Sequence, residues 1–267
     1  MDRIGSIAQQ PMDVRGAWQG LSGVDEHGSN ECEEFTVGPS KRQVDRAGDV
    51  LRAADLGDDV DDEMLAGALE IADSFRASHE MTLDRTRDGL LMVSSHLGAR
   101  EFSDRLKRLE TIQGKLIREP SLKLSRMRDI AGCRLVVPSQ SALEDVASRL
   151  MQDSPGVVVR VIDYVANPRP TGYRGIHVII RQNDRLAEIQ LRTQLMHRWA
   201  QISEGIQPIE DRERAATIGE AVTVWLHDLG EALACEDRGE TIPSDIRTRV
   251  QEAPLDVVEA LTIRWRS

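Results

Sequence analysis

The chain has 267 residues, 40% of them hydrophobic and 30% charged, as is usual for a globular protein with one large domain or two small ones. Its net charge of −11 argues against general binding to nucleic acids or anionic membranes. The three cysteines are widely spaced and support neither a disulfide framework nor a zinc site. Because the first residues lack an apolar signal core and no apolar run could span a bilayer, we expect a cytoplasmic protein without membrane contact.

Charge is unevenly distributed along the chain. Residues 1–64 hold six basic and fifteen acidic side chains, whereas residues 100–134 hold ten basic and five acidic ones. A basic segment within an acidic protein suggests a small polyanionic ligand such as a nucleotide. We expect this basic cluster to lie on a helix within residues 101–127.

The first part of the chain predicts disorder followed by helices. Residues 1–58 are acidic and rich in Gly and Ser without a sustained periodicity, which predicts a disordered segment. The acidic run 58–63 suits the N-terminus of a helix, where carboxylates interact favourably with the helix dipole. Apolar residues at helical spacing then predict helices over 64–75 and 83–97, with Gly98 ending the second.

Short apolar runs change the pattern in the second half of the chain. They predict strands over 134–138, 157–164, 175–180 and 186–192. A helix is expected over 140–152, a hairpin turn over 181–184, and helices again after 194. The fold class is therefore α/β (α+β).

Three features of these segments carry chemistry. Alternation in the strand 186–192 places Glu188, Gln190 and Arg192 on one face of the sheet. For an arbitrary strand this would be a solvated face, but here other polar signals accompany it. Just upstream, glycines flank Tyr173 on a loop that leads into a strand carrying His177, and the loop either is a simple turn or presents an aromatic platform for a purine base.

The third feature is Asp129, which precedes the first of the four predicted strands. A basic segment with an Asp before one strand and a Glu on another describes a phosphate-transfer site, in which cations hold phosphates and carboxylates hold Mg²⁺ or accept a proton. The sequence GxxxxGK[ST] is absent, which excludes a P-loop nucleotide site.

Four separated motifs resemble the synthetase domain of the RelA/SpoT alarmone synthetase family. They are RDIAGCRLVV, DYVANPRPTGYRGIH, EIQLRTQLMHRWA and the upstream spacing of Arg105, Lys107, Thr111 and Lys115, which is similar to an ATP-binding helix of that family. The resemblance runs over about 101–206. It implies a nucleotidyltransferase-like mixed β-sheet flanked by helices, with helical N- and C-terminal extensions.

The resemblance also implies an activity and roles for residues. Members of the family move pyrophosphate from ATP to the 3′-hydroxyl of GDP or GTP with Mg²⁺, making guanosine tetra- or pentaphosphate. The implied Mg²⁺ ligands are Asp129 and Glu188, and Glu188 is alternatively the general base. The resemblance assigns ATP contacts to Arg105, Lys107 and Lys115 and acceptor contacts to Tyr173, His177, Gln190, Arg192 and Arg169.

Some positions depart from the family pattern. Ile162 stands where Lys is common before Asp-Tyr, and Arg169 replaces a Lys. After Ala200 the chain continues with Ser203 and Glu204, where the family often has a Glu-His pair. These departures bear on the acceptor and leave the carboxylates intact.

The expected domains are an acidic N-terminal segment over 1–58, a synthetase domain over 59–210 and a C-terminal helical extension over 211–267. The chain is similar to small, synthetase-only members. Two alternatives stay open: a toxin-like relative that modifies an adenine nucleotide or a tRNA 3′ end, and a non-catalytic nucleotide-binding regulator. A homo-oligomer is compatible with each of them.

Overall fold

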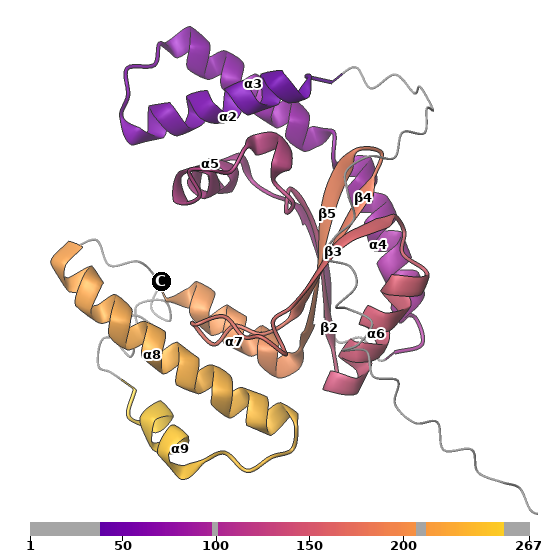
Figure 1. Cartoon of the computed structure of the whole chain (residues 1–267), viewed down its shortest axis with the longest axis vertical. Coiled ribbons are helices and arrows are strands. Elements are labelled where there is room, and N and C mark those ends of the chain that lie inside the picture. Colours follow the sequence, from indigo (N-terminus) through magenta and orange to yellow (C-terminus); the bar gives the residue numbers. More distant parts are fainter. Residues whose placement is uncertain (1–37, 98–100, 207–211, 254–267) are drawn as a thin grey trace, which may run out of the picture.

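A computed structural model describes residues 38–97, 101–206 and 212–253, and its centre is a mixed five-stranded sheet. The strands are β1 (Glu101–Leu106), β2 (Ala131–Val137), β3 (Val157–Asp163), β4 (Ile176–Gln182) and β5 (Arg185–Thr193). Their order is β1-β2-β5-β4-β3, with β2 and β5 parallel and every other pair antiparallel (Figure 1). The predicted strands and the mixed sheet are therefore confirmed.

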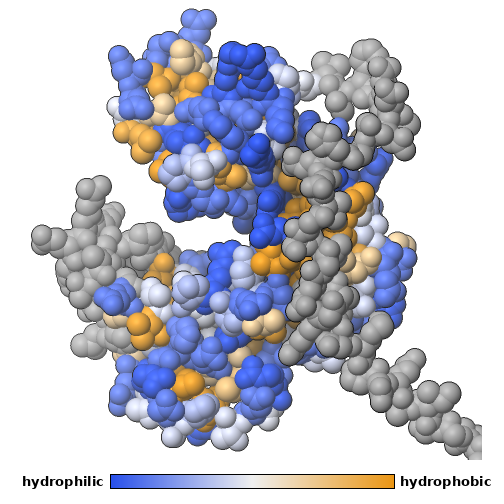
Figure 2. Space-filling view, in the orientation of Figure 1, coloured by the Kyte–Doolittle hydropathy of each residue, from blue (hydrophilic) through white to orange (hydrophobic). Residues whose placement is uncertain are grey.

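Helices in the described residues form three groups around this sheet. They are α2 (Lys41–Leu56), α3 (Asp62–Ala77), α4 (Glu80–Ser94), α5 (Leu109–Arg118), the 3₁₀ turn η1 (Leu124–Arg126), α6 (Gln140–Gln152), α7 (Gln194–Gly205), α8 (Arg212–Asp237) and α9 (Ser244–Gln251). Helices α4 and α6 cover one face of the sheet, while α2, α3 and α5 form a first lobe and α7, α8 and α9 a second lobe (Figure 1). Figure 2 shows the hollow between the two lobes, with hydrophilic residues along it.

The sheet has one apolar and one polar face because its strands alternate. The residues buried against α4 and α6 are mainly β-branched or aliphatic, and they include Val178, Ile189 and Leu191. Leu90 of α4 and Leu143 of α6 pack on them and are fully buried. Each such side chain stabilises the fold by about 1.5–3 kcal/mol relative to full exposure. The residues between them in sequence face the hollow.

The two lobes have different cores. The first lobe buries aliphatic side chains from α2, α5 and η1, among them Leu51, Ile112 and Leu124, around a single phenylalanine. The second lobe buries two tryptophans, Trp199 of α7 and Trp225 of α8, with a tyrosine from the loop before β4. Each lobe therefore has its own hydrophobic cluster, and the hollow lies between the two lobes.

Local sequence fixes several element ends as expected. Asp61 caps α3 by accepting from the backbone N–H of Met64, which places the predicted acidic run at a helix N-terminus. Asn183 and Asp184 both have positive φ and form the two-residue turn between β4 and β5. The predicted helix over 140–152 is confirmed as α6.

Three expectations about the first part of the chain need correction. Disorder over 1–58 is wrong for 41–56, because Ser40 forms a capping box and α2 packs its apolar stripe on α3 and α5; residues 1–37 lie outside the described residues. Residues 101–106 form a strand rather than a helix, because they pair with β2. Helix α4 ends at Ser94, earlier than predicted, and Gly98 lies outside the described residues.

Candidate functional site

The floor of the hollow is the polar face of the central strands. On β5, Glu188, Gln190 and Arg192 point away from α4 and α6, as the alternation predicts, while Ile189 between them is buried in the core. The register pairs Gln190 with His177 of β4, so His177 joins the same face. Four of the residues named from sequence thus meet on two neighbouring strands.

Asp129 lies beside this floor, held by two lysines. Its Oδ2 accepts a hydrogen bond from Lys107 Nζ at 2.8 Å, and its Oδ1 accepts one from Lys115 Nζ at 2.9 Å. Lys107 directly follows β1, and its backbone N–H donates to the carbonyl of Ile130, which directly precedes β2. Lys115 comes from α5. The structure therefore brings three residues named from sequence into one partly buried cluster.

Both carboxylates stay ionised. Burial raises the pKa of Asp129, but the hydrogen bonds and charges of Lys107 and Lys115 outweigh burial and hold the pKa below its ordinary value. Burial likewise raises the pKa of Glu188, and the hydrogen bonds and charge of His177, with a smaller contribution from Gln190, bring it below the ordinary value. Two negative charges therefore share the site at neutral pH.

A chain of hydrogen bonds orients Glu188. His177 Nδ1 lies 3.0 Å from Glu188 Oε1, and His177 Nε2 lies 2.6 Å from the Tyr173 hydroxyl. Nδ1–H donates to the carboxylate, and Nε2 shares one hydrogen with the tyrosine hydroxyl. Gln190 Nε2 donates to Glu188 Oε2 at 2.7 Å, and Arg192 donates to Gln190 at 2.9 Å. The carboxylate is thereby fixed in one orientation with lone pairs to spare.

Tyr173 is more buried than the sequence predicts. Its side chain is 9% exposed and makes edge contacts with Tyr164, His177 and Trp199, so it forms part of a wall rather than a free loop. Arg169 places its guanidinium 4.6 Å from the Tyr164 ring centre and 5.6 Å from the Tyr173 ring centre. The loop therefore gathers rings and a cation at one end of the floor.

Arg192 carries unmatched hydrogen-bonding capacity. It is 5% exposed, and its Nε and Nη1 atoms are buried without a hydrogen-bond acceptor among the described residues. A buried guanidinium with free N–H groups is costly unless it contacts an anion. Arg192 also lines the hollow, where its positive charge suits a phosphate.

Two adjoining cavities occupy the hollow, and both are lined by the two carboxylates. The larger, about 460 Å³, extends from Lys107 and Lys115 to Tyr173 and Trp199, and the smaller, about 270 Å³, extends over β1 and β2. They share Asp129, Glu188, Gln190, Arg192 and Glu204. Arg105 lines the smaller cavity, while Arg169 and His177 line the larger. Every residue to which the resemblance assigned a role in the site therefore lines one cavity or the other.

Several lining residues were not named from sequence. The strand alternation that identified Glu188 would also have placed Arg134 of β2 on the polar face, where its register partner is Gln190. Arg118 of α5 and Trp199 and Glu204 of α7 also line the larger cavity, and only the helical spacing from Lys115 could have indicated Arg118. Glu204 stood out in the sequence only as a departure from the family pattern, and neither Glu204 nor Trp199 could be placed in the site before their helix packs across the floor.

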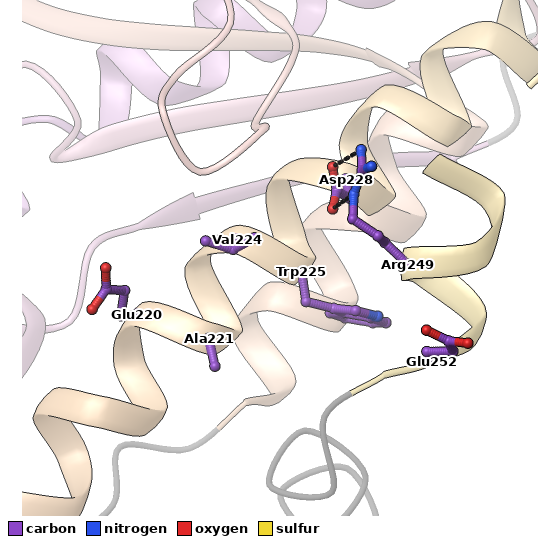
Figure 3. A pocket seen from close by; sticks show the side chains of 7 residues that line it. All are labelled: Glu220, Ala221, Val224, Trp225, Asp228, Arg249 and Glu252. Carbon is purple, nitrogen blue, oxygen red and sulfur yellow. Dashed lines mark hydrogen bonds and ion pairs between the residues drawn. The ribbon is translucent and has the colours of Figure 1, made fainter. Parts of the chain in front are cut away.

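A third cavity, about 450 Å³, lies between α8 and α9 and is separate from these residues (Figure 3). Its lining includes Trp225, Glu220 and the ion pair between Asp228 and Arg249. None of the residues named from sequence takes part in it. The candidate site is therefore the hollow between the lobes.

The donor set of the hollow fits Mg²⁺ held together with a substrate. Among the described residues, no three His, Cys, Asp or Glu side chains gather as a complete metal cage. Mg²⁺ usually takes only one or two protein carboxylates together with phosphate oxygens and water, and Asp129 and Glu188 line the same cavities. In the parts of the chain described, no helix has the length and apolar character needed to cross a membrane.

Known proteins match the same part of the chain. A family model for the region found in RelA and SpoT proteins matches residues 104–207. This range includes every residue named above for the hollow, but not the residues that line the cavity between α8 and α9. GTP pyrophosphokinase YjbM of Bacillus subtilis is 30% identical over 159 residues, 56% of this chain and 72% of the relative. The chain belongs to the RelA/SpoT family.

Other RelA/SpoT relatives agree with this assignment. GTP pyrophosphokinase YwaC of Bacillus subtilis is 32% identical over 128 residues, and the match covers 43% of this chain and 61% of that relative. The crystal structure of small alarmone synthetase 1 from Bacillus subtilis, bound to its product pppGpp, superposes with a TM-score of 0.52 at 25% identity. That match covers 67% of this chain and 97% of the other.

Proposed function

We propose that the protein transfers pyrophosphate from ATP to the 3′-hydroxyl of GDP or GTP in a Mg²⁺-dependent reaction that makes guanosine tetra- or pentaphosphate. One observation carries the proposal: the Asp129 carboxylate, bound by two lysine ammonium groups, and the Glu188 carboxylate line the same pair of cavities. Cations for phosphates and carboxylates for a metal and a proton are the parts that this transfer needs.

Glu188 takes the role of general base in this proposal. The 3′-oxygen of the acceptor attacks the β-phosphorus of ATP, the bond from that phosphorus to the α,β-bridging oxygen breaks, and AMP leaves. The hydroxyl proton passes to the Glu188 carboxylate, which is ionised because its pKa lies below the ordinary value. The hydrogen bonds from His177 and Gln190 hold the carboxylate in place for this transfer.

The donor nucleotide lies toward the first lobe. Lys107 and Lys115 contact the phosphates of ATP, and Arg105 of β1 contacts the nucleotide in the smaller cavity. Asp129, with Glu188 as the alternative second ligand, would hold Mg²⁺, which would supply positive charge against the phosphates. The lysine ammonium groups then remain within reach of those phosphates.

The acceptor lies toward the second lobe. Tyr173 offers its ring to the guanine base, and base stacking on an aromatic side chain contributes about 1–3 kcal/mol. Arg192 and Arg169 line the cavity on this side and supply positive charge for an acceptor phosphate. His177 and Gln190 line the cavity between the base and the transferred group. The names of YjbM and YwaC, both GTP pyrophosphokinases, support guanosine acceptors over other nucleotides.

The test is product identification with alternative acceptors. The purified chain would be incubated with Mg²⁺, ATP labelled in the β-phosphate, and GDP, GTP, ADP or tRNA in separate reactions. We expect label on GDP or GTP together with AMP, and at least a hundredfold lower rate for Glu188→Gln, the loss typical of a missing general base. Transfer to ADP or to tRNA alone would replace the proposed acceptor. No transfer to any acceptor would support a non-catalytic nucleotide-binding protein.

A further inference from the structure

The loop that carries Tyr173 rests directly on the backbone of α8. Gly172 has a φ of +87°, in the left-handed region that favours glycine. A Cβ atom at position 172 would lie 2.8 Å from the carbonyl oxygen of Leu226, and a Cβ atom at position 230 would lie 2.5 Å from the carbonyl oxygen of Gly172. The two glycines therefore permit an approach that no other residue pair would allow.

Polar contacts join the same two segments. Arg174, 8% exposed, donates to Glu231 of α8 at 2.7 Å and to the carbonyl oxygen of Gly172 at 3.3 Å. Trp199 of α7, which packs against Tyr173, donates its indole N–H to the Leu226 carbonyl at 2.8 Å. Tyr173 is thus fixed on either side by residues that contact α8.

The opposite side of α8 is supported in turn by α9. Arg249 of α9 donates to both oxygens of Asp228, at 2.7 and 3.1 Å (Figure 3). The Trp225 indole donates to the Val250 carbonyl. Helix α8 is therefore held between α9 and the Tyr173 loop and forms the backing of that loop.

We infer that Gly230 and Glu231 of α8 are positioning residues for the acceptor nucleotide, acting through the Gly172–Arg174 segment on the ring of Tyr173. The inference rests on the proposed function, since it takes the Tyr173 wall as the acceptor side. It makes α8 part of the acceptor site although none of the α8 side chains that the structure describes lines the two cavities of the hollow. A displaced Tyr173 ring would stack less well on the base, and loss of such stacking corresponds to about tenfold to a hundredfold in acceptor affinity.

Gly230→Ala is the direct test, with Gly67→Ala as its matched control. Both glycines lie within helices, but a Cβ at position 67 meets no atom within 4 Å. We expect Gly230→Ala to raise the Kd and the KM for GDP by about tenfold to a hundredfold, the range for lost base stacking, and to leave the Kd for ATP and the kcat at saturating GDP unchanged. Gly67→Ala should change none of these constants.

The pattern of constants separates positioning from a general loss of structure. A purely structural role of Gly230 would lower the amount of folded enzyme, and so kcat, without changing the KM for GDP. Unchanged GDP affinity in a folded Gly230→Ala variant would overturn the inference. If this variant does not fold, Glu231→Gln decides, because it weakens the contact with Arg174 without adding volume. It should raise the Kd for GDP severalfold, and wild-type affinity would overturn the inference.

The same measurements keep this inference distinct from the proposed function. GDP binding without transfer in the wild-type chain would refute the transferase, while the affinity ratio between Gly230→Ala and wild type would still decide the role of α8. If the wild-type chain transfers pyrophosphate and Gly230→Ala binds GDP as tightly as the wild type does, only the inference about α8 is refuted.

Discussion

The two walls of the hollow differ in chemistry, although each is built on its own hydrophobic cluster. The wall of the first lobe presents Lys115 from a helix whose buried side is aliphatic. The wall of the second lobe presents the rings of Tyr173 and Trp199. In a protein with only 3% aromatic residues, this concentration on one wall is informative. The comparison indicates that one wall suits phosphates and the other suits a base, with the carboxylates of the floor between them.

This difference implies different responses to salt. Contacts between lysine and phosphate weaken as ionic strength rises, because mobile ions screen charges that are partly exposed. Stacking of a base on a ring buries apolar surface and is far less sensitive to salt. Substitutions on one wall should therefore change the binding of one nucleotide, whereas substitutions on the floor should change turnover.

The largest effect is expected for Asp129→Asn on the floor. The substitution keeps the size of the side chain but removes the charge that would hold Mg²⁺ and attract Lys107 and Lys115. We expect kcat to fall by about a thousandfold, since a catalytic metal supplies several kcal/mol of charge stabilisation. Steady-state rates across a Mg²⁺ titration provide the measurement, with the exposed Asp145→Asn as the control. Wild-type turnover in the folded variant would remove Asp129 from the site.

A smaller effect, confined to the acceptor, is expected for Tyr173→Ala. Loss of the ring should weaken GDP binding by about tenfold to a hundredfold, which corresponds to roughly 1–3 kcal/mol of stacking. Because Tyr173 is buried against Trp199, the free energy of unfolding should also fall by about 3 kcal/mol. Tyr173→Phe keeps the ring and should retain most of the GDP affinity. If Tyr173→Ala weakens ATP instead of GDP, the assignment of the two walls is reversed.

Lys115→Gln should affect the donor alone. One of the two ammonium groups at Asp129 is lost while Lys107 remains, so we expect the Kd for ATP to rise about tenfold. The effect should shrink as salt is added. Lys123→Gln is the matched control, because Lys123 lies on the same lobe, pairs with Asp49 and does not line the larger cavity. Equal changes in GDP and ATP binding would argue against separate walls.

The smallest effect concerns stability at acid pH. The pKa of Asp129 lies below its ordinary value because the hydrogen bonds and charges of Lys107 and Lys115 outweigh burial, so the folded chain binds fewer protons there than the unfolded chain. The stabilisation is complete above the ordinary carboxyl pKa of about 4 and is lost as the pH falls through the lower folded pKa. Urea unfolding between pH 7 and pH 3 should show a smaller loss of stability in Asp129→Asn. If the free energy of unfolding falls equally with pH in the wild type and in Asp129→Asn, the ion pairs of Asp129 with Lys107 and Lys115 are contradicted.

The sequence predicted the strands and the polar face of β5 because both follow from local alternation. It failed for β1, whose residues form a strand only through pairing with β2, a partner about thirty residues away. Helix α2 was missed although the spacing of Val44, Ala47 and Leu51 indicates an amphipathic helix, since the acidic composition of the surrounding residues suggested disorder.

Side-chain surroundings were harder to predict than strands. The glycines beside Tyr173 suggested a free loop, but the buried position of its ring depends on Trp199 and on α8, which follow later in the chain. Arg134 was within reach of the same alternation that identified Glu188. Glu204 was not, because its place in both cavities depends on how α7 crosses the floor.

Parallel pairing of β2 with β5 has a consequence for how the chain acquires activity. These neighbouring strands, in which Gly132 lies opposite Glu188, are separated by the 47 residues 138–184, which include α6, β3 and β4. Closing so long a loop is entropically costly and slow compared with helix formation. During refolding, helical circular dichroism should therefore recover before pyrophosphate transfer does. The onset of activity then marks the completion of the sheet. A nascent chain that ends before β5 can form helices, but it lacks Glu188 and so cannot bring the two carboxylates together.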